Sequence, residues 1–378
     1  ISSGLGVQGM IWATSPAATE LETRVLDWLA GMMEMPEKFR STSTGGGVIQ
    51  DTASTSALTA VIAARERATN YESNKKGVQQ KLVAYISTQT HSSLEKAIKM
   101  AGIGSENLRL IDVDEKFAMR PDLLELQIEQ DKKAGLKPFF ICGALGTTSS
   151  NAMDPLDKIG EIAKNENCWF HIDAAMSGTA MLCPEFRYLM KGVESADSFT
   201  FNPHKWMFTN FDCDVFWVGN RNELINTFSI LPEYLKNKAT ESGAVFDYRD
   251  WHVQLGRRFR SLKLWFVIRH YGVEGLQLHI RKHVQLADEF AKWVENSAEF
   301  ELFVQPPLNL VCFRLKASDE LNLKLMNECN STGKIYFTHT KLNNQIVLRF
   351  SIGQTNTEKE HLEMAWTLIH EKVKEILN

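Results

Sequence analysis

The chain has 378 residues, which is more than one ordinary domain of ~100–200 residues, so we expect a large domain and a smaller one. Hydrophobic residues make up 44% of it and aromatic residues 10%, enough to bury a core, which excludes a disordered chain. The 42 Lys and Arg against 46 Asp and Glu give a formal net charge of −4, which argues against a nucleic-acid partner that needs a basic face.

The six cysteines lie far apart and form no C-x-x-C pair. This spacing predicts neither a zinc framework nor a disulfide scaffold and favours a reducing, cytoplasmic location. No apolar run approaches the ~18 residues of a membrane span, so we expect no membrane association.

In chain order, short β-branched or aromatic runs alternate with amphipathic helical stretches over the first 220 or so residues. This alternation predicts a mainly parallel sheet covered by helices. The predicted helices are residues 19–35, 52–69, 92–101, 121–133 and 155–165. The predicted strands are residues 81–87, 108–113, 138–145, 169–174, 198–201 and 212–218.

After residue 218 the pattern changes. Residues 228–249 have little periodicity and predict a long loop, and loops of this length in compact domains usually have a function. The rest of the chain predicts helices at 258–269, 274–295, 320–328 and 357–377 and strands at 309–315, 335–340 and 345–351. We therefore expect a large domain over residues 1–275 and a small α+β domain over residues 276–378.

Two polar residues follow apolar strands in the middle of the chain. Lys205 lies in Asn202-Pro203-His204-Lys205-Trp206, and Asp173 ends the strand of His171-Ile172-Asp173-Ala174-Ala175. A buried carboxylate is costly unless it meets a cation, although Asp173 alone could equally cap a helix or face solvent. A pyridinium nitrogen is such a cation, and pyridoxal phosphate (PLP) enzymes pair it with an acid while a lysine holds the aldehyde as a Schiff base.

A phosphate group prefers backbone N–H donors at a helix N-terminus. Gly45-Gly46-Gly47, followed by Asp51-Thr52-Ala53-Ser54-Thr55, offers a flexible approach and hydroxyl groups at the start of an Ala-rich helix. The same residues also suit an ordinary helix cap. His91 lies between a predicted strand and the next helix, where an imidazole could stack on an aromatic ring or have a structural role only.

Together these motifs strongly resemble the PLP-dependent aromatic L-amino acid decarboxylases, the group of DOPA, tyrosine, tryptophan and histidine decarboxylases. The resemblance runs in order from Trp12 to the final helix. The motifs that carry it are Gly45-Gly46-Gly47-Val48-Ile49-Gln50, Thr90-His91-Ser92-Ser93, His171-Ile172-Asp173-Ala174-Ala175, Asn202-Pro203-His204-Lys205-Trp206 and Leu255-Gly256-Arg257-Arg258-Phe259-Arg260.

The resemblance implies the fold shared with aspartate aminotransferase (fold type I), with a seven-stranded, mainly parallel sheet in the large domain and a small C-terminal α+β domain. It implies Lys205 as the Schiff-base lysine, Asp173 as the partner of the pyridine nitrogen and His91 as the stacking imidazole. The further cofactor-binding residues that it implies are Thr52, Ala53, Ser54, Thr148, Ala175, Asn202 and His204.

The activity that the resemblance implies is decarboxylation of an aromatic L-amino acid (tyrosine, DOPA, tryptophan or 5-hydroxytryptophan) to its amine. Tyr234 matches the loop tyrosine that returns a proton to the α-carbon across the subunit boundary of a homodimer. Aldehyde synthases, the alternative, typically replace this tyrosine by Phe or the stacking histidine by Asn, and here both Tyr234 and His91 are present.

Substrate choice depends on a pocket for which the resemblance implies Gln8, Met10, Met176 and Gly256. The glycine at position 256 resembles the residue found in the enzymes for bulky aromatic side chains more than the one found in histidine decarboxylases. The family also carries an N-terminal helical segment that contacts the partner subunit, and this sequence begins after it, so we expect it to be part of a longer polypeptide.

Other readings have weaker support. Gly4-Leu5-Gly6-Val7-Gln8-Gly9 matches the dinucleotide pattern G-x-G-x-x-G, but no strand can precede it, so an NAD-binding oxidoreductase is a distant alternative, as is a non-catalytic PLP-fold scaffold. His279 and His283 are four residues apart on a predicted helix, but without an H-E-x-x-H arrangement we expect a solvated face and no metal site.

Overall fold

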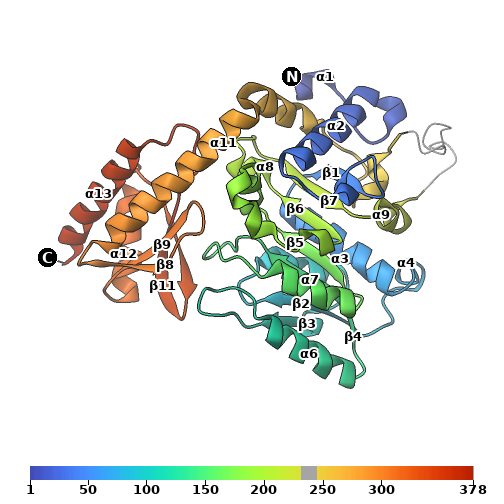
Figure 1. Cartoon of the computed structure of the whole chain (residues 1–378), viewed down its shortest axis with the longest axis horizontal. Coiled ribbons are helices and arrows are strands. Elements are labelled where there is room, and N and C mark those ends of the chain that lie inside the picture. Colours follow the sequence, from blue (N-terminus) through green and yellow to red (C-terminus); the bar gives the residue numbers. More distant parts are fainter. Residues whose placement is uncertain (231–244, 378) are drawn as a thin grey trace. The chain divides into compact units, whose positions relative to one another are not determined.

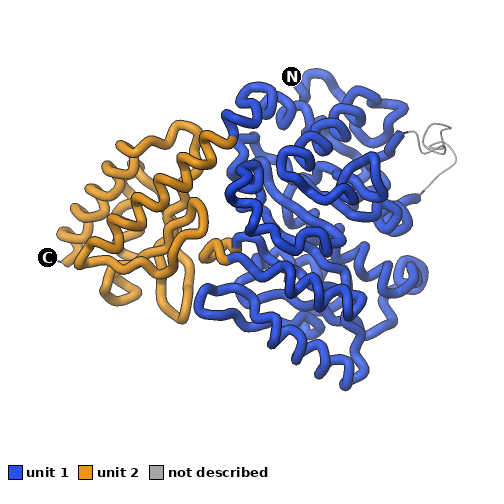
Figure 2. Tube along the Cα trace, viewed as in Figure 1, with its two compact units in different colours: residues 1–146, 153–276 blue, residues 147–152, 277–378 orange. Residues whose placement is uncertain are grey.

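The computed structural model describes residues 1–230 and 245–377. The chain divides into two compact units, residues 1–146 with 153–276 and residues 147–152 with 277–378 (Figure 2). Within the described residues, no helix is long and apolar enough to cross a membrane.

The first unit contains a seven-stranded sheet in the order β1-β7-β6-β5-β4-β2-β3 (Figure 1). Only β7 runs antiparallel to its neighbours, so β1 and the other strands all point the same way. The predicted α/β class with a mainly parallel sheet is therefore confirmed. The strands are β1 Gly46–Gln50, β2 Leu82–Ser87, β3 Leu108–Ile111, β4 Lys137–Ala144, β5 Trp169–Asp173, β6 Ser198–Phe201 and β7 Asp214–Val218.

Helices cover both faces of this sheet. On one face, α3 and α5 pack on a core that contains Val48 of β1 and Phe216 of β7. On the other face, Leu26 of α2 lies against Gly47, and α6 and α7 pack on β4. The main helices are α2 Pro16–Met32, α3 Ala53–Ala68, α5 Ser92–Met100, α6 Pro121–Lys133 and α7 Leu156–Asn165. The shorter helices are α1 Ser2–Leu5, η1 Trp12–Thr14, η2 Glu37–Phe39, α4 Ser73–Lys76, η3 Ser105–Asn107, η4 Ser177–Leu182, η5 Pro184–Met190, η6 Val193–Ser195, α8 Pro203–Trp206, α9 Arg221–Phe228 and η8 Tyr248–Trp251.

The sequence does not predict strand β1, because its glycines indicate a flexible segment. Pairing with β7 makes it a strand, and close packing requires the glycines. A Cβ on Gly47 would lie 2.7 Å from the Trp217 ring, and one on Gly45 would lie 1.9 Å from the Val218 carbonyl oxygen.

The predicted loop over residues 228–249 is only partly described. Helix α9 ends at Phe228, and residues 231–244 lie outside the described residues. The prediction is wrong only for the last two residues of this range, because the 3-10 helix η8 begins at Tyr248, which is buried in the same core as α3.

The second unit has an antiparallel sheet in the order β10-β11-β9-β8. Its core includes Phe290, which stacks on Phe350 with ring centroids 4.6 Å apart. The sequence does not predict strand β8. The elements of this part of the chain are α11 Arg260–Glu295, β8 Phe300–Val304, β9 Leu310–Leu315, α12 Asp319–Ser331, β10 Thr338–Leu342, β11 Gln345–Ser351 and α13 Lys359–Leu377.

Helix α11 starts in the first unit and is interrupted at Gly272, whose φ of 66° and ψ of 177° are not helical. The two predicted helices on either side of this glycine are therefore confirmed. The expected solvated face is wrong for His283, which is buried, with Nε2 2.9 Å from the Gln354 carbonyl oxygen.

A short segment after β4, residues 147–152, belongs to the second unit. The backbone carbonyl of Ser149 accepts a hydrogen bond from Arg349 Nε at 3.2 Å and one from the Cys312 thiol at 3.4 Å. The Ser149 hydroxyl accepts a hydrogen bond from Thr340 Oγ1 at 3.0 Å. Three elements of the C-terminal sheet therefore hold this segment.

Candidate functional site

The sheet topology brings most of the predicted site residues to one edge. Strands β1, β2, β5 and β6 point the same way, so their carboxyl ends share an edge, where open α/β sheets bind ligands. Thr52 caps α3 after β1, and His91 caps α5 after β2. Asp173 ends β5, and Lys205 lies in α8 directly after β6.

Asp173 is buried, with 8% of its surface exposed. Its Oδ1 accepts a hydrogen bond from the Ala175 N–H at 3.0 Å. The Ala175 carbonyl in turn accepts from the Asn202 N–H at 2.8 Å, which joins the end of β5 to the end of β6. No Lys, Arg or His of residues 1–230 and 245–377 forms an ion pair with this carboxylate.

Lys205 is exposed, and its backbone N–H donates to the Asn202 carbonyl at 2.9 Å. Its amine acts electrostatically on a carboxyl group that the sequence did not indicate, Asp214 at the start of β7. Burial raises the pKa of Asp214 well above its ordinary value, and hydrogen bonds from Ser56 and Thr200 oppose this; the Asp173 charge raises it further, and the Lys205 charge lowers it.

Asp214 is fully buried where α3, β6 and β7 meet. It accepts hydrogen bonds from the Ser56 hydroxyl of α3 and from Thr200 Oγ1 of β6, which lies 3.0 Å from both carboxyl oxygens. In the sequence, Asp214 could be noticed only as a lone acidic residue in the apolar run Cys213-Asp214-Val215-Phe216. Its hydrogen-bond partners depend on strand pairing that the sequence does not reveal.

His204 lies between Asn202 and the start of β7. Its Nδ1 accepts a hydrogen bond from the Cys213 N–H at 2.8 Å, and its Nε2 is 2.9 Å from the Asn202 amide. Burial, and next the charge of Lys205, lower the pKa of His204 to about 4, so the ring is neutral at pH 7.

The N-terminus of α3 is open to an anion. The Thr52 hydroxyl makes no capping hydrogen bond, so the N–H groups of Ala53 and Ser54 in the first turn have no side-chain cap. His91 is exposed at the start of α5, where its Nδ1 accepts from the Ser93 N–H at 3.2 Å.

Three of the four predicted pocket residues lie on neighbouring segments. Gln8 Oε1 accepts a hydrogen bond from the Arg257 N–H at 3.1 Å, and Gln8 Nε2 would lie 3.3 Å from a Cβ on Gly256. The Met10 carbonyl accepts from the Arg249 N–H at 3.2 Å. Met176 is not on these segments and lies half-buried at the start of η4.

The buried side chain of Arg257 fixes this arrangement. It pairs with Glu22 of α2 and donates to the carbonyls of Gly9 (3.2 Å) and Ile49 (3.0 Å). Glu22 also accepts the Ile49 N–H at 2.8 Å, so one ion pair ties the segment before η1 to α2 and β1.

Two further predicted residues are Tyr234 and Thr148. Tyr234 lies outside the described residues. Thr148 follows the carboxyl end of β4, which is parallel to β5, and belongs to the segment of the second unit described above. Their roles remain predictions.

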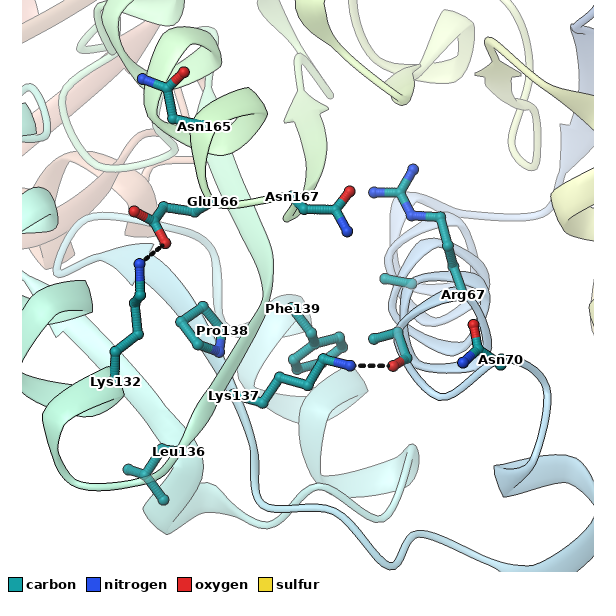
Figure 3. A pocket seen from close by; sticks show the side chains of 12 residues that line it. Arg67, Asn70, Lys132, Leu136, Lys137, Pro138, Phe139, Asn165, Glu166 and Asn167 are labelled. Carbon is teal, nitrogen blue, oxygen red and sulfur yellow. Dashed lines mark hydrogen bonds and ion pairs between the residues drawn. The ribbon is translucent and has the colours of Figure 1, made fainter.

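A cleft of about 480 Å³ lies at the opposite edge of the sheet, where β4 and β5 begin (Figure 3). Its basic side chains already have partners: Lys132 pairs with Glu166 (2.6 Å), and Lys137 Nζ donates to the Ala68 carbonyl (2.6 Å). Arg67 pairs with Asp197 (2.6 Å). Arg67 and Lys137 compensate the C-terminal end of α3 and Lys132 that of α6, which is a structural role.

Known proteins are similar to this chain in both sequence and fold. The chain is 48% identical to tryptophan decarboxylase 2 of Oryza sativa subsp. japonica, over all of this chain and 77% of that protein. It is 47% identical to phenylacetaldehyde synthase of Arabidopsis thaliana, over all of this chain and 79% of that protein. The crystal structure of Oryza sativa TDC with PLP and tryptamine superposes with a TM-score of 0.96 at 41% identity, covering all of this chain and 80% of that one. Residues 1–316 match the model of the pyridoxal-dependent decarboxylase conserved domain. The chain therefore belongs to the pyridoxal-dependent decarboxylase family.

Proposed function

We propose that the polar residues at the carboxyl edge of the first sheet form the site of a PLP-dependent carboxy-lyase that converts an aromatic L-amino acid to its amine and CO2. The observation that carries this proposal is the buried carboxylate of Asp173, which has no ion-pair partner among residues 1–230 and 245–377, on the same edge as the exposed Lys205. The family and its aromatic-substrate relatives support the reaction type.

The residues present fit PLP. Asp173 needs a cation to offset its burial, which a protonated pyridine nitrogen would provide. The first turn of α3, with Thr52, Ala53 and Ser54, would hold the phosphate, and Lys205 would hold the aldehyde carbon. His91 would lie against the ring.

When bound, PLP supplies an electron sink for the electron pair that stays on the α-carbon as CO2 leaves. In the net reaction the bond between the α-carbon and the carboxylate breaks, and a proton takes its place. The Asp173 carboxyl group at the edge of β5 would pair with the ring nitrogen and favour its protonated form. Tyr234 is proposed to deliver the proton to the α-carbon.

The second candidate is an aldehyde synthase, because a phenylacetaldehyde synthase is among the relatives. The presence of both Tyr234 and His91 favours the amine. Replacing Tyr234 by Phe should divert product from amine toward aldehyde: dissolved O2 is the two-electron oxidant and leaves as hydrogen peroxide, and water releases the nitrogen as ammonia. If the Phe variant made only amine at the normal rate, the role of Tyr234 would be wrong.

The direct test is to incubate the purified protein and PLP with tyrosine, DOPA, tryptophan, 5-hydroxytryptophan, phenylalanine and histidine. Amines and CO2 should appear from one or more of the aromatic substrates and not from histidine. Peroxide and ammonia in amounts equal to CO2 would instead identify the aldehyde synthase. PLP binding without CO2 from any substrate would favour a non-catalytic scaffold.

We also propose that the protein is a homodimer with its site at the subunit boundary and that it works in the cytoplasm. The exposure of Lys205 in the single chain supports a second subunit that covers the site. The six buried, free cysteines support a reducing compartment. Sedimentation of the purified protein should give twice the 42.9 kDa chain mass, and a monomer active at high dilution would contradict the shared site.

A further inference from the structure

Gln8 has a side-chain amide whose orientation is set by the backbone beside it. The N–H of Arg257 can only donate, so the atom of Gln8 that lies 3.1 Å from it is the amide oxygen Oε1. The other end of the amide, the nitrogen Nε2, lies beside Gly256, 3.3 Å from where a Cβ would be. Because glycine has no Cβ, the space in front of this nitrogen stays open.

Backbone contacts hold this amide in place. The Gly9 N–H donates to the Arg257 carbonyl at 3.1 Å, and Arg257 Nη1 donates to the Gly9 carbonyl at 3.2 Å. The Gln8 carbonyl accepts a hydrogen bond from the Ser15 hydroxyl at 2.6 Å. Residues 8–9 and 256–257 therefore lie side by side, and we call them the Gln8 wall. A group held in this way loses little conformational freedom when it binds a ligand.

The Gln8 wall combines a free donor with apolar surface. Among the residues that the structure describes, none accepts a hydrogen bond from Gln8 Nε2. Leu255, the neighbour of Gly256, is 59% exposed, and Val253 is 48% exposed. Apolar side chains with a few placed polar groups are typical of a small-molecule site. This combination suits an aromatic ring that carries a polar substituent.

The Gln8 wall lies at the edge of the sheet that carries the proposed cofactor site. Gln254 Nε2 donates to Asp51 Oδ2 at 3.4 Å, and Asp51 directly precedes the Thr52 cap of α3. Further along the same segment, Arg260 pairs with Asp212 at 3.0 Å, just before β7. The segment that carries Gly256 thus runs along this edge. In the proposed homodimer it would close the site at the subunit boundary.

We propose that Gln8 Nε2 donates a hydrogen bond to a ring hydroxyl of the substrate, so that the enzyme prefers tyrosine, DOPA and 5-hydroxytryptophan to phenylalanine and tryptophan. This inference rests on the proposed function and names its substrate class. A ring without a hydroxyl leaves the desolvated amide without an acceptor, which costs more than the missing bond alone. Gln8 thereby determines specificity through binding and takes no part in the loss of CO2.

The kinetic test compares substrates that differ by one hydroxyl. The wild type should have a kcat/KM on the order of 10-fold higher for tyrosine than for phenylalanine, and for 5-hydroxytryptophan than for tryptophan. Gln8→Met keeps the length of the side chain but removes both polar atoms, so both ratios should fall to about 1 to 3, through a higher KM for the hydroxylated substrates. A merely structural role would lower kcat/KM for both members of each pair and leave the ratios unchanged.

Two further variants complete this test. Gln79→Met changes an exposed glutamine whose amide donates to the Lys76 carbonyl, and it should leave both ratios as in the wild type. Gln8→Ala removes the amide without filling its place and carries the same expectation as Gln8→Met if the latter does not fold. Ratios near 1 in the wild type, or ratios that Gln8→Met and Gln8→Ala do not change, overturn the proposal.

Binding of amines separates this inference from the proposed function, because it needs no turnover. Calorimetric titration of the PLP-loaded wild type should give a dissociation constant on the order of 10-fold lower for tyramine than for phenethylamine, and Gln8→Met should bind both equally. If CO2 is released but Gln8→Met keeps the hydroxyl preference, the inference fails and the proposed function stands. If no CO2 is released but Gln8→Met loses the tyramine preference, the inference stands and the proposed function fails. Absence of both CO2 release and a tyramine preference overturns both.

Discussion

At the scale of single residues, the sequence predicts that Asp173 and Lys205 reach the carboxyl edge of the sheet, because each lies at the end of an apolar strand or directly after one. Such residues reach the edge of a parallel sheet whatever the order of its strands. Asp214 was not predicted because β7 runs antiparallel to its neighbours. The beginning of that strand, not its end, therefore reaches this edge. Residue patterns along one strand do not reveal its direction in the sheet.

Lys205→Ala should remove the amine that holds the cofactor. We expect kcat/KM to fall on the order of 10³-fold or more, and borohydride reduction should no longer attach PLP to the peptide that contains residue 205. Lys132→Ala, which removes a lysine of the opposite cleft, is the control and should change neither quantity. Retained covalent labelling in Lys205→Ala would assign the role to another lysine.

At the scale of elements, the helices and parallel strands of the first unit were predictable because their hydrophobic periods are strong. The segment 46–50 was not, because its strand character comes from pairing with residues 214–218, far away in the sequence. Its glycines argue against a strand when the sequence is considered alone, but the packing of the strand requires them. The site depends on this element, since β1 leads directly into the cap of α3.

Gly47→Ala should therefore be costly. The added Cβ would lie 2.7 Å from Trp217 and 3.0 Å from Leu26, which forces the packing between β1 and α2 to shift. We expect a loss of about 1–3 kcal/mol in the free energy of unfolding, measured in urea. Gly4→Ala, where no atom lies within 4 Å of the new Cβ, should stay close to the wild type.

The interruption of α11 gives a second test of an element. Gly272 has a φ of 66°, which disfavours an L-residue, and no atom lies within 4 Å of a Cβ there, so any cost of Gly272→Ala comes from the backbone. We expect a loss of about 1–3 kcal/mol. Gly275→Ala, inside the same helix with helical backbone angles, should instead gain about 0.5–1 kcal/mol. Equal effects of the two changes would contradict the strained position at Gly272.

At the scale of the whole molecule, stability should depend on pH through buried histidines. Burial lowers the pKa to about 4 for His171, His204 and His283 and to about 3 for His252. Because the unfolded chain has the ordinary, higher histidine pKa, it binds more protons than the folded chain between pH 6.5 and 4. The free energy of unfolding should therefore fall as the pH is lowered through this range.

His171 provides the cleanest test, because it is fully buried. Its share of the loss between pH 7 and pH 5 should be about 2 kcal/mol. His171→Asn keeps an acceptor for the Ser198 hydroxyl but removes the titrating ring, so urea unfolding at the two pH values should show a smaller difference than in the wild type. An unchanged difference would mean that His171 does not contribute.

The placement of residues 147–152 in the second unit limits how the chain can be dissected. A fragment that starts at residue 277 would lack Ser149, and the Arg349 guanidinium and the Cys312 thiol would lose the carbonyl they share. Such a fragment, expressed from its own gene, should be poorly soluble. A synthetic peptide carrying residues 147–152, added in trans or fused through a linker, should improve its yield.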